Sequence, residues 1–395
     1  MSSVEVAVVG GGVIGLSVAW CAARAGFSVS LSDLGSPHAG SRVAGGMLAP
    51  VAEAWHGEET VTAQGVEALV LWPEFAAALG VELFNKGTIT VATSPGDLAD
   101  LRRIVELFNN PDVESLNNPQ VGSLTARGVG SLNNPSVGSL NNPGVELLNS
   151  RAIRQLEPSL GPAVRGGMFV PGDLAVDNRE LLSALRKACV EAGVKFESTV
   201  DDSALEARPA TTTTRPATTT TQLAAATTQP ATTTTHRAVT VIAAGAWSGN
   251  LHPALKDVIR PVKGEILRLA WRPGTLPPPT RTIRGSVSGR SVYLVPRHDG
   301  IVVGATQYEA GFDTDVTVAG VRDLLRDAET VLPGIAEYAL TEAAVGFRAG
   351  SPDNVPVVRW LEPGVIAATG HHRNGLLLAP HTAREVVELL KGGSS

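Results

Sequence analysis

The hydrophobic pattern of the first forty residues predicts two strands with a helix between them. Residues 4–9 form a near-continuous apolar, mostly β-branched run, which is typical of a strand buried on both faces of a parallel sheet. Residues 17–25 are rich in alanine and stop just before Gly26, as a helix with a glycine C-terminal stop does. Residues 29–32 resume a strand that ends at Asp33. Together these segments predict a βαβ unit of ordinary length.

Beyond residue 50 the apolar positions alternate between helical and strand periodicity. Helical spacing predicts helices over 61–79, 98–108, 150–156, 179–191, 321–331 and 376–391. Short β-branched runs predict strands over 88–92, 168–171, 195–200, 238–244, 265–270, 291–296, 301–306, 343–348 and 364–369. The pattern from residue 262 onward is rich in strands. The chain is therefore predicted to be an α/β protein with a second, β-rich unit.

Two stretches lack the pattern of a compact domain. Residues 109–148, the octapeptide insert, consist of NNPDVESL, NNPQVGSL, TARGVGSL, NNPSVGSL and NNPGVELL. A period of eight with Asn-Asn-Pro predicts one turn per repeat, in an inserted surface loop or a short stack of β-turn coils. Residues 209–235, the threonine-rich insert, lack large apolar side chains to bury. That composition indicates an exposed linker or a weak edge hairpin.

Composition narrows the class of protein. The 395 residues include 43% hydrophobic and 18% charged residues, which fits a folded chain of two packed domains. The formal net charge of −6 argues against binding to a nucleic-acid backbone, which requires a basic face. Two cysteines, Cys21 and Cys189, can build neither a disulfide scaffold nor a four-thiolate zinc site. We expect a reduced, cytoplasmic protein.

One uncharged stretch requires a decision about membranes. Residues 6–23 carry no charged side chain, which is long enough to suggest a membrane span or a signal peptide. Three successive glycines, Gly10 to Gly12, interrupt it, and no Lys or Arg precedes it. Such glycines destabilise a helix but suit a tight turn. We therefore expect no membrane partner.

The glycines form the strongest chemical signal of the chain. Gly10, Gly12 and Gly15 have G-x-G-x-x-G spacing between the first strand and the first helix. Such glycines allow a tight turn and a close approach of a pyrophosphate to the helix N-terminus, which attracts anions. Asp33 ends the second strand, where a carboxylate can accept hydrogen bonds from an adenosine ribose. The motif predicts a dinucleotide site without deciding between NAD and FAD.

Two further segments favour FAD. Residues 41–48 (SRVAGGML) are small and glycine-rich, which suits a loop along a second phosphate and a flat ring. Residues 370–375 (GHHRNG) join a late strand to a helix, whose N-terminus can stabilise the negative charge of a reduced flavin. An NAD(P)-dependent reductase, which needs no such C-terminal return, is the disfavoured alternative.

At these residues the chain resembles the FAD-dependent D-amino-acid oxidase superfamily, and within it the glycine oxidases of thiamine biosynthesis. The matching stretches are VAVVGGGVIGLSVAW, RVAGGMLAP, IAAGAWSG, PVKGE, VYLVPR-DG-IVVGAT, GFRAGSPDN-P and ATGHHRNGLLLAP. They cover most of 1–108 and 149–395 in the order of the family, whereas both inserts fall outside its pattern. The resemblance implies a Rossmann-like FAD-binding domain of the glutathione-reductase type, interleaved with an antiparallel-sheet substrate domain.

The resemblance also implies domain limits, all approximate. The FAD-binding domain would comprise 1–50, 149–260 and 349–395, and the substrate-binding domain 51–108 and 261–348. Relatives of this kind are often homo-oligomers, and nothing in the sequence fixes the number of subunits.

The same resemblance assigns site residues. Non-covalent FAD would be held by residues of the glycine motif, of the following loop and of the C-terminal turn, with Val200 meeting adenine through its backbone. These are Gly10, Gly12, Val13, Ile14, Gly15, Asp33, Leu34, Gly40, Ser41, Gly45, Gly46, Met47, Val200, His371, His372, Arg373, Asn374, Gly375, Leu376 and Leu377. The catalytic set would be Arg348 and Tyr293, which bind the substrate carboxylate, and Arg373, which lines the pocket.

Alternatives remain at several of these residues. Arg348 could form a structural ion pair, and Tyr293 could be a core aromatic with a satisfied hydroxyl. His371 and His372 are adjacent on a turn, where their side chains diverge, so no metal site is expected. The expected reaction is oxidation of glycine, with oxygen as the acceptor. A D-amino-acid, sarcosine or other small-amine oxidase remains open, as does a flavin-binding protein without activity.

Overall fold

A computed structural model describes residues 4–33, 35–55, 57–109, 144–198, 238–287 and 289–393. Its strands form three sheets of six, eight and three strands. Most of the octapeptide insert and all of the threonine-rich insert lie outside the described residues, as do Leu34 and Val200. No described helix is long and apolar enough to cross a bilayer, and the uncharged stretch 6–23 folds as a strand, a turn and a helix.

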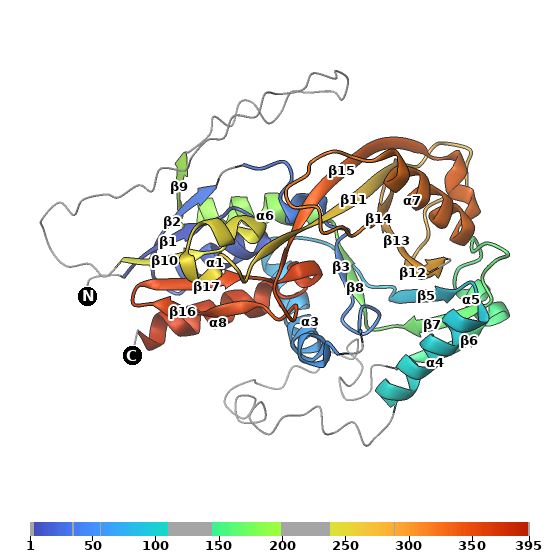
Figure 1. Ribbon diagram of the computed structural model, residues 1–395, viewed down its shortest axis with the longest axis horizontal. Helices are drawn as coiled ribbons and strands as arrows, with labels where there is room; N and C mark the ends of the chain where they lie inside the picture. The colour runs from blue at the N-terminus through green and yellow to red at the C-terminus, as the bar shows by residue number, and fades with distance from the viewer. Residues whose placement is uncertain are drawn as a thin grey trace, which may run out of the picture.

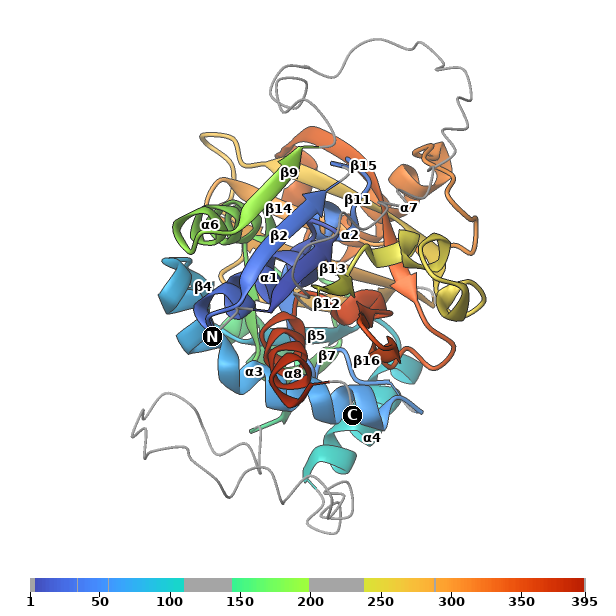
Figure 2. The ribbon, with the colours of Figure 1, turned by 90° about the vertical axis from the view of Figure 1, so that its left-hand side faces the viewer.

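The six-stranded sheet is Rossmann-like. Its order is β16 (Val357–Glu362), β17 (Val365–Thr369), β10 (Ala238–Ile242), β1 (Glu5–Val9), β2 (Ser28–Asp33) and β9 (Lys195–Ser198). All neighbours are parallel except β16 and β17. The helix that connects β1 to β2, α1 (Val13–Arg24), packs against α6 (Asn178–Glu191) and α8 (Ala379–Gly392). Figure 2 views this half of the molecule with β2, β9, α6 and α8 toward the reader.

The apolar residues of α1 explain this packing. Leu16, Val18 and Ala19 are buried, as are Val6 and Val8 of β1. Because side chains of a strand alternate between its two faces, Val6 and Val8 share the buried face of β1, whereas Ala7 and Val9 on the other face are only partly buried. The same cluster includes side chains of α6 and α8, so segments far apart in sequence share one core.

The eight-stranded sheet is almost entirely antiparallel. Its order is β15 (Ala339–Gly350), β11 (Arg260–Ala270), β14 (Gly300–Gly304), β13 (Arg290–Arg297), β12 (Thr282–Val287), β5 (Thr88–Ala92), β7 (Gly166–Val170) and β6 (Glu146–Asn149). Only β5 and β12 pair in parallel. The helix α7 (Val318–Val331) covers β11 to β14, and α4 (Pro95–Asn109) and α5 (Ser150–Leu156) pack near β7 (Figure 1).

A short segment joins the two large sheets. The helix α2 (Gly40–Val43) contacts both α6 and β15. The backbone N–H of Phe347 in β15 donates a hydrogen bond to the carbonyl of His38, just before α2 (3.1 Å). The third sheet, β3 (Met47–Leu48), β8 (Leu174–Val176) and β4 (Leu83–Phe84), follows directly. The 21-residue α3 (Glu59–Leu79) then packs on α8 and α6.

The α/β fold with a parallel and an antiparallel sheet confirms the predicted fold class, with local differences. The ranges 88–92 and 150–156 match β5 and α5. The last helix begins at Ala379 rather than 376, because a 3₁₀ turn (η6, His372–Asn374) and two further turn hydrogen bonds occupy the segment before it. Strands β12 and β16 were absent from the prediction. The strand β7 lies in the predicted FAD-binding range 149–260 but pairs in the eight-stranded sheet; the domain limits stay a prediction.

Candidate active site

The glycine motif forms a turn in which two positions have no room for a side chain. Gly10 has a φ of +121°, and a Cβ there would lie 2.3 Å from the carbonyl oxygen of Ala243. A Cβ on Gly15 would lie 1.8 Å from the carbonyl oxygen of Gly10. The first glycine thus permits the left-handed turn, and the last lets α1 pack onto it.

The N-terminus of α1 carries a built anion cradle. Gly12 is its N-cap and offers no capping side chain. The N–H of Val13 donates a hydrogen bond to Oγ of Ser41, the second residue of α2 (3.0 Å). Asp33 Oδ2 lies against Gly11, where a Cβ would come within 2.1 Å of it, and Arg186 forms an ion pair with the same oxygen (3.3 Å). This edge of the sheet, between β10 and β2, is where strand order reverses and nucleotides bind in such folds.

The predicted loop 40–47 runs from this cradle toward Tyr293. A Cβ on Gly40 would lie 2.7 Å from the carbonyl oxygen of Phe347, so α2 approaches β15 closely. Gly45 lies under the Tyr293 ring, and Gly46 has a φ of +89°. Met47 begins β3, and Ile14 is buried in α1.

The C-terminal turn is built from buried residues. His371 Nε2 lies 2.9 Å from Thr382 Oγ1 of α8, and Trp72 of α3 donates its Nε1–H to the carbonyl of Leu377 (2.9 Å). Asn374, Leu376 and Leu377 are buried, and Gly375 ends η6. The turn is therefore fixed by two helices from opposite ends of the sequence.

Arg348 lies in β15, opposite Val262 of β11, and is largely buried. Its guanidinium lies over Gly264, where a Cβ would come within 2.5 Å of Nη1. Among the described residues its one hydrogen bond is from Nη1 to the carbonyl of Thr306 (3.2 Å), and it forms no ion pair. Burial lowers the pKa of Arg348, and the charge of Arg373 lowers it further.

Tyr293 lies in β13 beside Arg348. Its ring is held between two glycines: a Cβ on Gly304 would lie 2.2 Å from its Cζ, and one on Gly45 2.6 Å from its Cε2. Burial raises the pKa of Tyr293, while the charge of Arg348 opposes that rise. The hydroxyl therefore stays protonated at neutral pH and can donate a hydrogen bond next to a guanidinium.

Arg373 is engaged by the segment that precedes α3. Both of its Nη atoms donate to the carboxylate of Glu58, Nη1 at 3.1 Å, and Nη2 also reaches the carbonyl of Glu53 (3.2 Å). Asn354 Nδ2 donates to Glu58 Oε1 (2.7 Å). Burial raises the pKa of Glu58, but the hydrogen bonds from Arg373 and Asn354 outweigh it and lower the pKa overall. Glu58 is thus a carboxylate whose charge neutralises Arg373.

Two more arginines of the site have carboxylate partners. Arg284 of β12 lies 2.9 Å from Glu53, and both side chains are buried. Arg297 lies 2.7 Å from Asp177 and donates to the carbonyl of Gly45 (2.8 Å). The sequence motifs gave no role to Glu53, Glu58 or Arg284. Arg297 is the last residue of the VYLVPR stretch that contains Tyr293, and this position was the only indication in the sequence that it belongs to the site.

The two histidines of the turn are neutral at physiological pH. Burial lowers the pKa of His371 to about 3, and burial together with the charges of Arg348 and Arg373 lowers that of His372 to about 3. His372 has a φ of +45°. Within the described ranges, no three His, Cys, Asp or Glu side chains gather as metal ligands.

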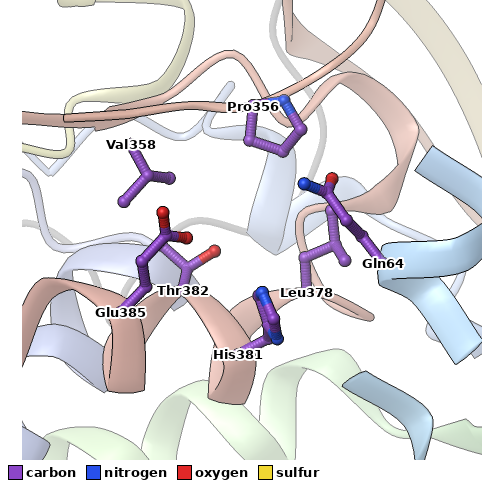
Figure 3. Close-up of a pocket in the computed structure, with 7 residues that line it drawn as sticks. All are labelled: Gln64, Pro356, Val358, Leu378, His381, Thr382 and Glu385. Carbon is purple, nitrogen blue, oxygen red and sulfur yellow. The ribbon is translucent and has the colours of Figure 1, made fainter. Parts of the chain in front are cut away.

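A separate small cavity lies behind the turn. Figure 3 shows it between α3, β16 and α8, lined by Gln64, Pro356, Val358, Leu378, His381, Thr382 and Glu385. Its volume of about 40 Å³ suits a few water molecules but neither FAD nor an amino acid.

The sequence of the chain matches one known protein family over nearly its whole length. The DAO family of FAD-dependent oxidoreductases matches residues 5–389. The chain belongs to this family. The N-terminus of α1 fits the pyrophosphate of FAD, because the N-cap Gly12 places no capping side chain there and a helix N-terminus attracts anions.

Particular relatives carry more specific names. The chain is 33% identical over 240 residues to the bifunctional protein ThiO/ThiG of Synechocystis sp., covering 60% of this chain and 34% of that protein. It spans between a third and about half of the bifunctional relatives it matches. The glycine oxidase of Geobacillus kaustophilus is 27% identical over 404 residues, covering 98% of this chain and 93% of the relative. A crystal structure of glycine oxidase from that organism superposes with a TM-score of 0.74 at 24% identity, over 100% of this chain and 96% of the other.

We expect Gly15→Ala to weaken FAD retention. The new methyl group would collide with the backbone of Gly10, so the turn could not keep its shape, and FAD affinity should fall by at least about tenfold. The measurement is flavin absorbance relative to protein absorbance after purification. Gly172→Ala, where no atom lies within 4 Å of the added Cβ, is the matched control. Full flavin content in Gly15→Ala would contradict the assignment of the turn.

We expect His371 to make the folded state sensitive to acid. Its folded pKa of about 3 lies below the ordinary 6.5, so between these values the unfolded chain binds the extra proton. The contribution of neutral His371 to the stability of the folded state is therefore complete above pH 6.5 and is lost as the pH falls toward 3. In His371→Gln, the dependence of unfolding free energy on pH between 6 and 4 should be shallower by about 1.4 kcal/mol per pH unit.

Urea unfolding of the FAD-loaded protein at several pH values measures this slope. His298→Gln, a substitution at a side chain that is 64% exposed, should keep the wild-type slope. Equal slopes in wild type and His371→Gln would show that His371 is not held neutral.

Proposed function

We propose that this protein is a glycine oxidase. It would oxidise glycine to an imine, which hydrolyses to glyoxylate and ammonia, with oxygen as the electron acceptor and hydrogen peroxide as the product. The observation that carries the proposal is the largely buried guanidinium of Arg348, which has no carboxylate partner among the described residues. A planar guanidinium in this state suits bidentate binding of a substrate carboxylate.

The charges around Arg348 support this assignment. Arg284, Arg297 and Arg373 each face a carboxylate, respectively Glu53, Asp177 and Glu58. Among the described arginines of the site, this leaves Arg348 without a carboxylate partner. A buried charge is costly until an opposite charge meets it. The amino-acid carboxylate would supply that charge.

Tyr293 would fix the orientation of the same carboxylate. Its ring cannot rotate freely between Gly45 and Gly304, so its hydroxyl has a defined position beside Arg348. Two anchors on one carboxylate set the direction of the α-carbon, and such positioning contributes strongly to rate.

FAD, when bound, supplies the chemistry that accepts a hydride from the substrate α-carbon. The residues proposed to hold it non-covalently are those assigned to it above. The turn 371–377 would face the flavin ring and Asp33 the ribose. Covalent attachment through a late cysteine is unavailable in this sequence, because no cysteine follows Cys189.

No side-chain base is needed for this reaction. The substrate amine reacts in its neutral form, with its lone pair forming the imine as the hydride leaves. His371 and His372 would stay neutral at working pH, because burial lowers the pKa of each to about 3. The two histidines therefore add no positive charge that would repel the substrate if its amine arrives protonated, before it loses its proton and reacts.

The biological setting is proposed from the names of relatives. A relative from Rhizobium etli named as a putative thiamine biosynthesis oxidoreductase ThiO supports a role in thiamine biosynthesis. The cytoplasmic location and the homo-oligomeric assembly are proposed from the family resemblance of the sequence alone. Sarcosine and small D-amino acids are the alternative substrates. Gln307, which follows the quoted GAT stretch, is exposed and leaves the pocket size open.

We expect Arg348→Ala and Arg348→Lys to lose most glycine turnover. Alanine removes the guanidinium, and lysine keeps the charge but cannot donate two parallel hydrogen bonds. Both variants should raise KM strongly, and the fall in kcat/KM should correspond to a loss of about 2–4 kcal/mol of transition-state binding. Steady-state peroxide formation measures this. Arg359→Ala, at an exposed arginine of β16, is the matched control. Unchanged glycine kinetics in an Arg348→Ala protein that retains FAD would overturn the role of Arg348.

A further inference from the structure

The ion pair between Glu58 and Arg373 occupies a second guanidinium next to the proposed carboxylate site. Arg373 lies in η6, which packs against β15, the strand that carries Arg348; the charge of Arg373 lowers the pKa of Arg348. Its two Nη atoms nevertheless both donate to Glu58. The side chains are 19% and 15% exposed, so water screens the pair weakly.

Glu58 is itself held in place. Asn354, in the segment after β15, donates to Glu58 Oε1 at 2.7 Å. The carbonyl of Glu53 accepts from Arg373 Nη2, so the guanidinium ties both ends of the segment 53–58 to the C-terminal turn. This geometry directs both Nη atoms of Arg373 toward Glu58 and the carbonyl of Glu53.

The pair limits how much negative charge the site can accept. With Glu58 ionised, a ligand meets one unpaired guanidinium, that of Arg348. A ligand with two acidic groups would bring its second negative charge toward an arginine already neutralised, and toward the carboxylate that neutralises it. Like charges in a weakly screened site repel strongly.

We propose that Glu58 is a specificity-determining residue: by holding Arg373, it restricts the site to amino acids with a single acidic group and rejects those with two. This inference rests on the proposed function, since it takes Arg348 as the first carboxylate anchor. Removing the charge of Glu58 would release Arg373 as a second anchor. The ligand class gained would be amines that carry two carboxylates.

The test compares ligands that differ by one carboxylate. Acetate and malonate are titrated into FAD-loaded wild type and Glu58→Gln, and their Kd values are read from perturbation of the flavin spectrum. We expect the ratio of the malonate Kd to the acetate Kd to fall by about tenfold or more in Glu58→Gln. Turnover of iminodiacetate relative to glycine should rise in the same variant.

Three further variants separate this role from a structural one. In the double variant Glu58→Gln/Arg373→Gln the ratio should return toward the wild-type value, because the released guanidinium is gone. Asn354→Ala, which removes only the bond orienting Glu58, should move the ratio in the same direction by less. Glu388→Gln, which removes the exposed partner of Arg384, should leave the ratio unchanged.

The outcomes are distinguishable. An unchanged ratio in Glu58→Gln, or a lowered ratio that persists in the double variant, overturns the role of Glu58. If wild type binds neither acetate nor glycine, the carboxylate site at Arg348 is itself wrong and both proposals fail. A lowered ratio that depends on Arg373 supports the specificity role.

Discussion

A guanidinium removed from water must meet negative charge, and this requirement organises the site. Arg348 is largely buried, yet among the described residues it meets only the carbonyl of Thr306. The neighbouring arginines are each paired, so the unbalanced charge is confined to one place. Such an arrangement costs stability in the free protein. Binding of an anion would make it favourable, which is the physical basis of the proposed carboxylate site.

The fold keeps this charge beside the cofactor cradle by joining two sheets over a short distance. The segment around α2 contacts α1 through Ser41 and β15 through His38 and Phe347. Gly45, a few residues later, lies under the Tyr293 ring. The proposed dinucleotide site at α1 and the proposed carboxylate site at β15 would therefore be joined through this segment. The C-terminal turn completes it, fixed by Trp72 of α3 and Thr382 of α8.

Local patterns were enough to predict the glycine turn and most long elements, because their signals lie within one segment. Strand β12 was missed because Arg284 and Gly285 interrupt its apolar alternation, and the strands of the third sheet are too short to show a period. The site shows the same division. A local spacing motif identifies Gly10, Gly15 and Asp33. In contrast, Glu58 and Arg373, which form a hydrogen bond, are 315 positions apart in the sequence. No local pattern in the sequence specifies a pairing over such a separation. The predicted cofactor contacts of Leu34 and Val200 stay predictions, because both residues lie outside the described part of the chain.

In the proposed function, a carboxylate bound at Arg348 places an amine for oxidation by FAD. The decisive measurement is the visible spectrum of the purified protein, recorded before and after anaerobic addition of glycine. We expect the bands of oxidised flavin, their bleaching by glycine, and peroxide when air is admitted. A yellow protein that neither glycine, sarcosine nor small D-amino acids bleach would contradict the proposed function.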